Sequence, residues 1–141
     1  MGFLSSLDIS GSALSAQRLR MDVISQNIAN AQTTETAAGG PYRRKVCVMS
    51  ERAASPFSAV FGRTLGSGVK VSGIVEDMSD FELEYAPDSP LAGPDGYIRK
   101  PNVDEVEEII DLMSATRSFE ANITALDATK SMAVKALEIG R

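Results

Sequence analysis

The chain has 141 residues and carries 19 acidic against 14 basic side chains, a net charge of −5 at neutral pH. Nucleic-acid binding needs a surplus of positive charge to displace phosphate counterions, so this balance argues against a nucleic-acid partner. There is no histidine, the usual general base and metal ligand, and Cys47 is the only cysteine. We therefore expect no catalytic site, no cofactor and no metal site.

The N-terminal segment lacks the features of a secretory signal. Its apolar residues are scattered, no basic region precedes them, and Arg18 and Arg20 stand where an apolar core would continue. The sequence also contains no run of eighteen or more apolar residues, so it predicts no membrane-spanning helix.

A helical period extends over residues 8–31, in which apolar side chains recur at intervals of three, four and seven. Asp8 or Ser10 can cap its start, and Gly39-Gly40-Pro41 breaks the chain beyond its end. The small residues on this face permit another helix to approach closely. The main apolar positions are Leu14, Met21, Ile24 and Ile28.

The middle of the chain, residues 35–100, has the pattern of a small β-rich region. Residues 42–49 and 68–76 alternate in the way expected of strands, and residues 82–85 form a short third candidate. Val46 and Val48 are predicted to face away from Cys47 and Met49.

A long hairpin loop, residues 50–67, connects the first two predicted strands. Its Phe57, Val60 and Phe61 pack either on one another or against a partner, two alternatives that the sequence leaves open. Residues 86–96 are rich in proline, glycine and aspartate, which is typical of turns.

The clearest pattern begins at Asn102 and continues to Gly140. Asn102 and Glu105 have the spacing of a capping box, and further glutamates follow at the positive end of the helix dipole. A helix of about 38 residues would be about 57 Å long. Its 3-4 spacing consists of Ile109, Leu112, Thr116, Phe119, Ile123, Leu126, Lys130, Ala133 and Leu137.

These patterns predict an α+β fold in which long N- and C-terminal helices pack as a coiled-coil-like pair with a small antiparallel β region between them. The expected divisions are an N-terminal helix in residues 1–34, the β-rich region in 35–100 and the C-terminal helix in 101–141. The first helix, at about 36 Å, is too short to cover the second. We therefore expect the terminal helices to pack against other subunits as well as against each other.

The predicted assembly interface combines the apolar stripes with two asparagines. Buried amides must be hydrogen-bonded, and they can fix the register of a helical seam; the alternative is that these asparagines simply end the helix. Ion pairs between subunits are a further possibility for four charged side chains, with a solvated surface as the alternative. The interface candidates are Leu14, Met21, Ile24, Asn27, Ile28, Asn30, Leu112, Phe119, Ile123, Leu126, Ala133 and Leu137, and the ion-pair candidates are Arg18, Arg20, Arg117 and Glu120.

An enzymatic or metal-binding reading has little support. Asp77, Asp80, Glu82 and Glu84 are close in sequence, but their spacing lacks the glycine and terminal glutamate of a calcium loop. A solvated acidic face is the better interpretation. A soluble coiled-coil adaptor that binds one partner remains a second class of function.

The segment from Ser15 to Ala31, above all Asn27-Ile28-Ala29-Asn30 followed by Thr33-Thr34, resembles the N-terminal signature of the flagellar rod and hook family. The second half, with Tyr85-Ala86-Pro87, Gly96-Tyr97-Ile98 and Pro101-Asn102-Val103-Asp104, is similar to the proximal rod proteins of that family. The stretch Arg117-Ser118-Phe119-Glu120-Ala121-Asn122 resembles their C-terminal helix.

This resemblance implies a subunit exported unfolded through the flagellar type III apparatus, without a cleaved signal, into the periplasmic rod of the bacterial basal body. There it would assemble helically with copies of itself and with the rod proteins FlgB, FlgF, FliE and FlgG, and would transmit motor torque. A FlgB-like or distal rod subunit is the alternative within the family.

Overall fold

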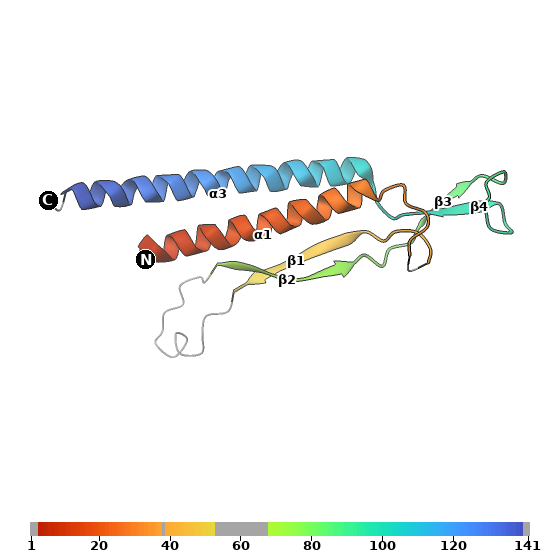
Figure 1. Ribbon diagram of the computed structural model, residues 1–141, viewed down its shortest axis with the longest axis horizontal. Helices are drawn as coiled ribbons and strands as arrows, with labels where there is room; N and C mark the ends of the chain where they lie inside the picture. Colours follow the sequence, from red (N-terminus) through yellow and green to blue (C-terminus); the bar gives the residue numbers. More distant parts are fainter. Residues whose placement is uncertain (1–2, 38, 53–67, 140–141) are drawn as a thin grey trace.

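The computed structural model describes residues 3–37, 39–52 and 68–139. Within these ranges, two long helices stand at either end and four short strands lie between them, which confirms the predicted α+β fold (Figure 1). The elements are α1 (Phe3–Ala29), β1 (Lys45–Glu51), β2 (Val69–Glu76), β3 (Glu82–Tyr85), β4 (Tyr97–Lys100) and α3 (Glu105–Ile139).

The molecule is elongated and has three layers over most of its length. Helix α1 packs against α3 on one side and against the two-stranded ribbon of β1 and β2 on the other (Figure 1). The β3–β4 hairpin extends beyond the helices, at the end opposite the C-terminus. Neither described helix is long and apolar enough to cross a bilayer.

Helix α1 begins at Phe3, five residues before the predicted start at Asp8. Two contacts with the chain at the end of the ribbon hold the first turns of this helix in place. The carboxylate of Asp8 pairs with Arg52 at 2.6 Å, and the hydroxyl of Ser12 accepts a hydrogen bond from the backbone N–H of Val69 at 3.0 Å. Gly11 therefore lies inside the helix rather than in its first turn.

Helix α3 begins at Glu105, and Asp104 caps it. The Asp104 carboxylate accepts hydrogen bonds from the backbone N–H groups of Val106 and Glu107, at 2.8 and 3.3 Å. The predicted capping box starting at Asn102 is therefore wrong. An aspartate can only accept hydrogen bonds, whereas the Asn102 amide also donates, and it joins two other segments of the chain.

The first two predicted strands form an antiparallel hairpin, as expected, with a register shift between Val48 and Met49. Strand β1 starts at Lys45 rather than at residue 42. The alternation is also confirmed, because Val46 and Val48 are exposed while Cys47 and Met49 are half-buried. The predicted loop cluster of Phe57, Val60 and Phe61 lies outside the described residues.

The third predicted strand, β3, does not join this ribbon but pairs with β4, which the sequence interpretation missed. The hairpin closes through the turn at residues 86–96, where Gly96 has a φ of +76°. The rings of Tyr85 and Tyr97 meet edge to face with their centroids 5.2 Å apart. The β region is thus two separate ribbons.

The apolar core is small and consists largely of small side chains. Its buried hydrophobic residues are Ala16, Val23, Ile24, Ala31, Tyr42 and Ala115. Within the described part of α3, only Glu108 and Ala115 are buried. A long helix with so little burial depends on something other than its own core for cover.

The Gly68→Ala substitution should destabilise the chain by about 1–3 kcal/mol. Gly68 has a φ of +94°, and an added Cβ would clash with the Ser12 hydroxyl that holds α1 to the ribbon. Urea unfolding monitored by circular dichroism measures the loss. Gly73→Ala is the matched control in the same ribbon, because no atom lies within 4 Å of its added Cβ; equal losses in both variants would contradict the argument.

Candidate assembly interface

A polar junction made of Asn27, Tyr42, Arg44, Lys45 and Glu108 fixes the relative positions of α1, β1 and α3. The Asn27 side chain is 1% exposed and uses its full hydrogen-bonding capacity. Its Nδ2 donates to the Lys45 carbonyl at 2.9 Å and to Glu108 Oε2 at 3.0 Å. Its Oδ1 accepts from the Tyr42 hydroxyl and from the Lys45 N–H, both at 3.0 Å.

Glu108 is the buried charge of the junction, and Arg44 neutralises it. The Nε of Arg44 donates to Glu108 Oε1 at 2.5 Å, and the same guanidinium lies 3.7 Å from Asp111 and 3.8 Å from Asp77. Burial lowers the pKa of Arg44, but the hydrogen bond to Glu108 and the negative charge of that carboxylate together raise it by more. The pKa of Arg44 therefore lies above its ordinary value. The junction therefore contains a paired carboxylate rather than an isolated one, which a buried site requires.

Tyr42 completes the junction as a neutral donor. Burial, together with the negative charges of Glu108 and Glu76, raises the pKa of its phenol above 10.0. The hydroxyl therefore keeps its proton at physiological pH and continues to donate to Asn27.

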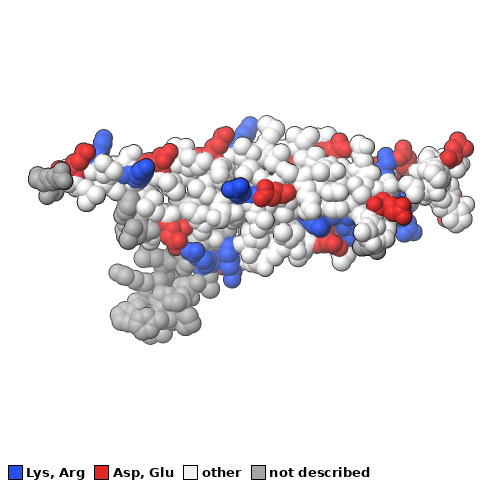
Figure 2. Space-filling model, in the orientation of Figure 1, with Lys and Arg blue, Asp and Glu red and all other residues white. Residues whose placement is uncertain are grey.

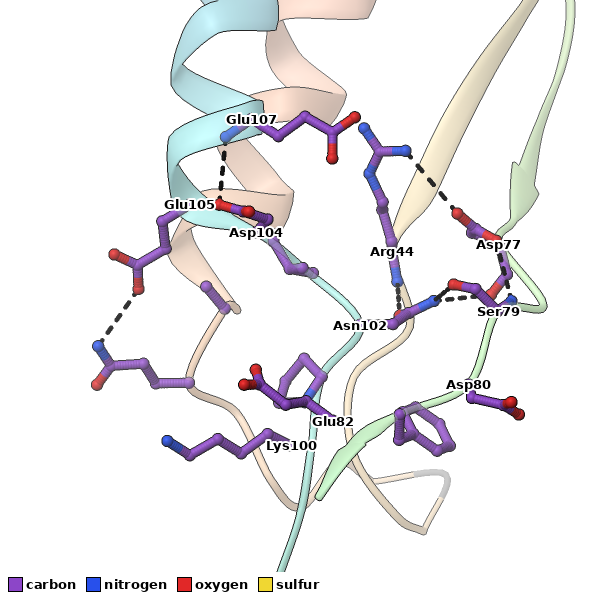
Figure 3. A pocket seen from close by; sticks show the side chains of 15 residues that line it. Arg44, Asp77, Ser79, Asp80, Glu82, Lys100, Asn102, Asp104, Glu105 and Glu107 are labelled. Atoms are coloured by element: carbon purple, nitrogen blue, oxygen red, sulfur yellow. Dashed lines mark hydrogen bonds and ion pairs between the residues drawn. The ribbon is translucent and has the colours of Figure 1, made fainter. Parts of the chain in front are cut away.

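Next to the junction, Asn102 ties the start of α3 to the chain on either side of the ribbon. Its Oδ1 accepts from the backbone N–H of Arg44 at 2.9 Å, and its Nδ2 donates to the Asp77 carbonyl at 3.1 Å and to the Ser79 hydroxyl at 2.7 Å. These groups form one wall of an open pocket of about 820 Å³ (Figure 3). Asn102 acts as a structural bridge, where the sequence suggested a helix cap.

The acidic residues near this pocket do not converge on a common point. Glu84 pairs with Lys100 at 2.6 Å, and Asp77 accepts from the backbone N–H of Ser79 at 3.0 Å. The side chain of Asp80 points away from the pocket centre in Figure 3. Among the residues that the structure describes, no group of three or more cysteine or carboxylate side chains could hold a metal ion.

The predicted interface residues separate into three groups by exposure. Two are buried inside the subunit, Ile24 and Asn27. Two others, Ile123 and Leu137, are exposed. The remaining eight are half-buried, so that each has surface left to contact a neighbour: Leu14, Met21, Ile28, Asn30, Leu112, Phe119, Leu126 and Ala133.

Of the four ion-pair candidates, Arg20 is paired within the subunit, with Asp111 at 3.4 Å. Arg18, Arg117 and Glu120 are exposed, and they form no ion pair with any other described residue. These three stay candidates for contacts between subunits.

The sequence interpretation missed a second apolar surface, on the side of α3 that faces away from α1. Its residues follow the i, i+3, i+4, i+7 pattern of one helical face, and that signal is present in the sequence. It was overlooked because Ile109 was assigned to the inner stripe, although Ile109 is 49% exposed. The surface consists of Val106, Ile109, Ile110 and Met113.

Replacing Asn27 with leucine should lower the free energy of unfolding by about 3 kcal/mol or more, because the Lys45 backbone, Tyr42 and Glu108 would all lose buried hydrogen bonds. Denaturant unfolding of the purified chain checks this value. Asn30→Ala is the control, since the Asn30 amide only bonds locally, to the Gln26 carbonyl and to Thr33. A loss below about 1 kcal/mol in Asn27→Leu would refute the role of the junction.

Acid should remove the contribution of the ionised Asp77 side chain to the stability of the fold. The N–H of Ser79, and then the Ser79 hydroxyl and the charges of Arg44 and Arg43, hold the pKa of Asp77 below 3.8. The stabilisation is therefore present above pH 3.8 and is lost as the pH falls through the lower, folded-state pKa. In unfolding experiments from pH 6 to pH 2, Asp77→Asn should lose less stability than the natural chain below about pH 4. Parallel curves for the two chains would contradict this assignment.

Comparisons with known proteins place this architecture in a family. Residues 7–35 match the family model described as "Flagella basal body rod protein", and residues 95–139 match "Flagellar basal body rod FlgEFG protein C-terminal". These two matches cover most of α1, including Asn27, and the whole of α3.

Three curated relatives are similar over nearly their whole length, and each is named "Flagellar basal-body rod protein FlgC". The protein of Bacillus subtilis is 50% identical over 96% of this chain and 97% of its own length. The protein of Salmonella typhimurium is 43% identical over all of both chains, and that of Borreliella burgdorferi is 42% identical over 99% and 98%. The chain therefore belongs to the FlgC family of flagellar basal-body rod proteins.

Proposed function

We propose that this structural subunit of the flagellar basal-body rod completes its fold only by packing against neighbouring subunits, and that the resulting helical assembly is the proximal part of the shaft that transmits motor torque. The segments 1–34 and 101–141 would form its axial core. The single observation that carries this proposal is the large apolar surface of α3 that one chain leaves uncovered.

Part of the uncovered surface lies where α3 extends past α1. A helix of 35 residues is about 52 Å long, and one of 27 residues is about 40 Å long, so that the end of α3 has no described partner in its own chain. Leu137 and Ile139 in this end are 76% and 85% exposed. Each such side chain would contribute roughly 1.5–3 kcal/mol if it were fully buried.

Charge does not protect this surface from association. Lys, Arg, Asp and Glu are scattered over a largely uncharged face, with both signs intermixed (Figure 2). Exposed apolar side chains of the kind that α3 carries mark sites of protein–protein contact when they lie together on one face. An interface between two different surfaces of repeated subunits gives an open helical filament if it does not close into a ring, which is the form a rod requires.

The family supports assembly with other components of the rod, and we propose FlgB, FlgF, FliE and FlgG as those neighbours. We further propose delivery through the flagellar type III export apparatus, a position in the periplasm, and no enzymatic activity. The low content of buried core supports export as an extended chain, because little folding energy has to be overcome before secretion.

Deleting the gene and imaging purified basal bodies tests the function directly. Loss of the rod in the deletion strain, restored by the natural chain, is the expected result. Intact rods of normal length in that strain would overturn the proposal and would favour an adaptor that binds a single partner.

Leu137→Ser should impair assembly while leaving the isolated subunit as stable as before, because Leu137 is exposed in the single chain. Losing its burial between subunits would weaken each contact by about 10- to 100-fold. Recovery of the chain in basal bodies and swimming in soft agar measure the defect, and urea unfolding measures subunit stability.

Leu112→Ser is the matched variant, since Leu112 is half-buried on the side of α3 that faces α1. It should lower the stability of the isolated subunit. A Leu137→Ser chain that assembles normally, or that unfolds as readily as Leu112→Ser, would count against an intersubunit role for the end of α3.

A further inference from the structure

Two apolar surfaces lie on opposite outer faces of the three-layered molecule. The helix surface belongs to α3 and faces away from α1, and its four side chains are 49–66% exposed. The ribbon surface belongs to β1 and β2, and its three side chains are 36–50% exposed. The helix surface consists of Val106, Ile109, Ile110 and Met113, and the ribbon surface consists of Val46, Val48 and Val75.

The ribbon surface faces outward because of strand alternation. Val46 lies directly opposite Val75 in the register of the hairpin, so that both side chains stand on the same face. Cys47 and Met49, between the outward valines, are half-buried on the side of α1. Val46, Val48 and Val75, three β-branched side chains, therefore give the ribbon an apolar outer face.

The helix surface faces outward because of helical geometry. Its members are spaced i, i+3, i+4 and i+7, which places them on one face. Glu108 and Ala115, the buried residues of α3, lie on the opposite face against α1. Since α1 separates α3 from the ribbon, the two apolar surfaces cannot touch each other within one chain (Figure 1).

The two surfaces also lie at the same height along the molecule. Asn27 donates hydrogen bonds to both Lys45 and Glu108, so these two residues lie at the same level and serve as the common origin for distances along β1 and α3. From that origin β1 and α3 run in the same direction (Figure 1). At about 3.3 Å per strand residue and 1.5 Å per helix residue, Val48 lies about 10 Å along and Met113 about 8 Å along.

One pair of opposite charges continues this match. Lys70 lies opposite Ser50 in the hairpin, about 17 Å from the origin, and Glu120 lies about 18 Å along α3. Both side chains are exposed, and neither forms an ion pair with another residue in the described ranges. Lys70, beyond the ribbon surface, and Glu120, beyond the helix surface, thus lie at nearly the same position along the long axis of the molecule.

We propose that the ribbon surface of one copy packs against the helix surface of a second copy at the same height, with Lys70 of one facing Glu120 of the other. The contact is between different surfaces, so it leaves the opposite surface of each copy free for the next and adds copies side by side around the rod. The inference rests on the proposed function and adds to it which faces of the chain meet.

Cysteine cross-linking in the host bacterium tests the contact in assembled rods. In a chain with Cys47→Ala, Val75→Cys is combined with Ile110→Cys, and purified basal bodies are treated with a short bismaleimide. The expected result is a ladder of adducts at multiples of the chain mass. Chains with only one of the two cysteines should give no adduct, because the contact does not pair a surface with itself.

Val75→Cys combined with Thr124→Cys is the matched control. Thr124 lies on the same face of α3, but about 21 Å further along, out of reach of the reagent. Equal ladders in this control, dimers from a single-cysteine chain, or adducts only with a different protein would each overturn the proposal. So would a chain that is fully incorporated into rods and remains monomeric. Absence of the natural chain from basal bodies would refute the proposed function itself.

A charge exchange keeps the inference testable if a cysteine variant fails to fold. Lys70→Glu and Glu120→Lys should each reduce the recovery of the chain in rods, by at most about fivefold for each contact. The double exchange should restore it toward the natural level. Additive losses in the double variant would refute the pairing, since unrelated sites show no rescue.

Discussion

The amide of Asn27 is the constraint on which the rest of this structure depends. An amide is the side-chain group that can donate twice and accept twice at one point, and all four positions are used here. Aspartate would present acceptors to the Lys45 carbonyl and the Glu108 carboxylate, and leucine would leave every partner unsatisfied. The bonds join a helix, a strand and a second helix at one height. These bonds therefore fix how far α1, β1 and α3 are shifted along one another, and with that the relative positions of the outer surfaces.

The junction matters more in this chain than it would in a compact domain, because the apolar seam between the helices is thin. Ala16 and Ala115, the buried alanines of α1 and α3, allow the backbones to approach closely but contribute little buried area. A seam of small residues tolerates sliding, since neighbouring turns of the helices look alike. A buried, fully bonded amide next to a paired carboxylate removes that freedom, because any slide breaks several bonds at once.

Much of this arrangement could be predicted from the sequence, and the failures have physical causes. The two helices and the first hairpin follow from long, uninterrupted periodicity. Strand β4 has four residues flanked by turns, too few to show a period. Asn102 and Asp104 are both good caps by residue type, and only the tertiary partners of the Asn102 amide decide between them. Asn27 was correctly interpreted as a costly amide that needs partners, but these proved to lie in its own chain.

The distribution of side-chain size is the reverse of that in an ordinary monomeric bundle. Alanines make up half of the buried hydrophobic core, while many valine, isoleucine, leucine and methionine side chains are exposed on the outer faces. Because the stabilisation from burial grows with apolar area, the proposed contacts between subunits would add apolar stabilisation that the single chain leaves unused. The free chain should be only marginally stable, and its stability should rise as neighbouring subunits bind to it. In the proposed assembly, polar hydrogen bonds would set the shape of the subunit, while apolar contacts would set the strength of the rod.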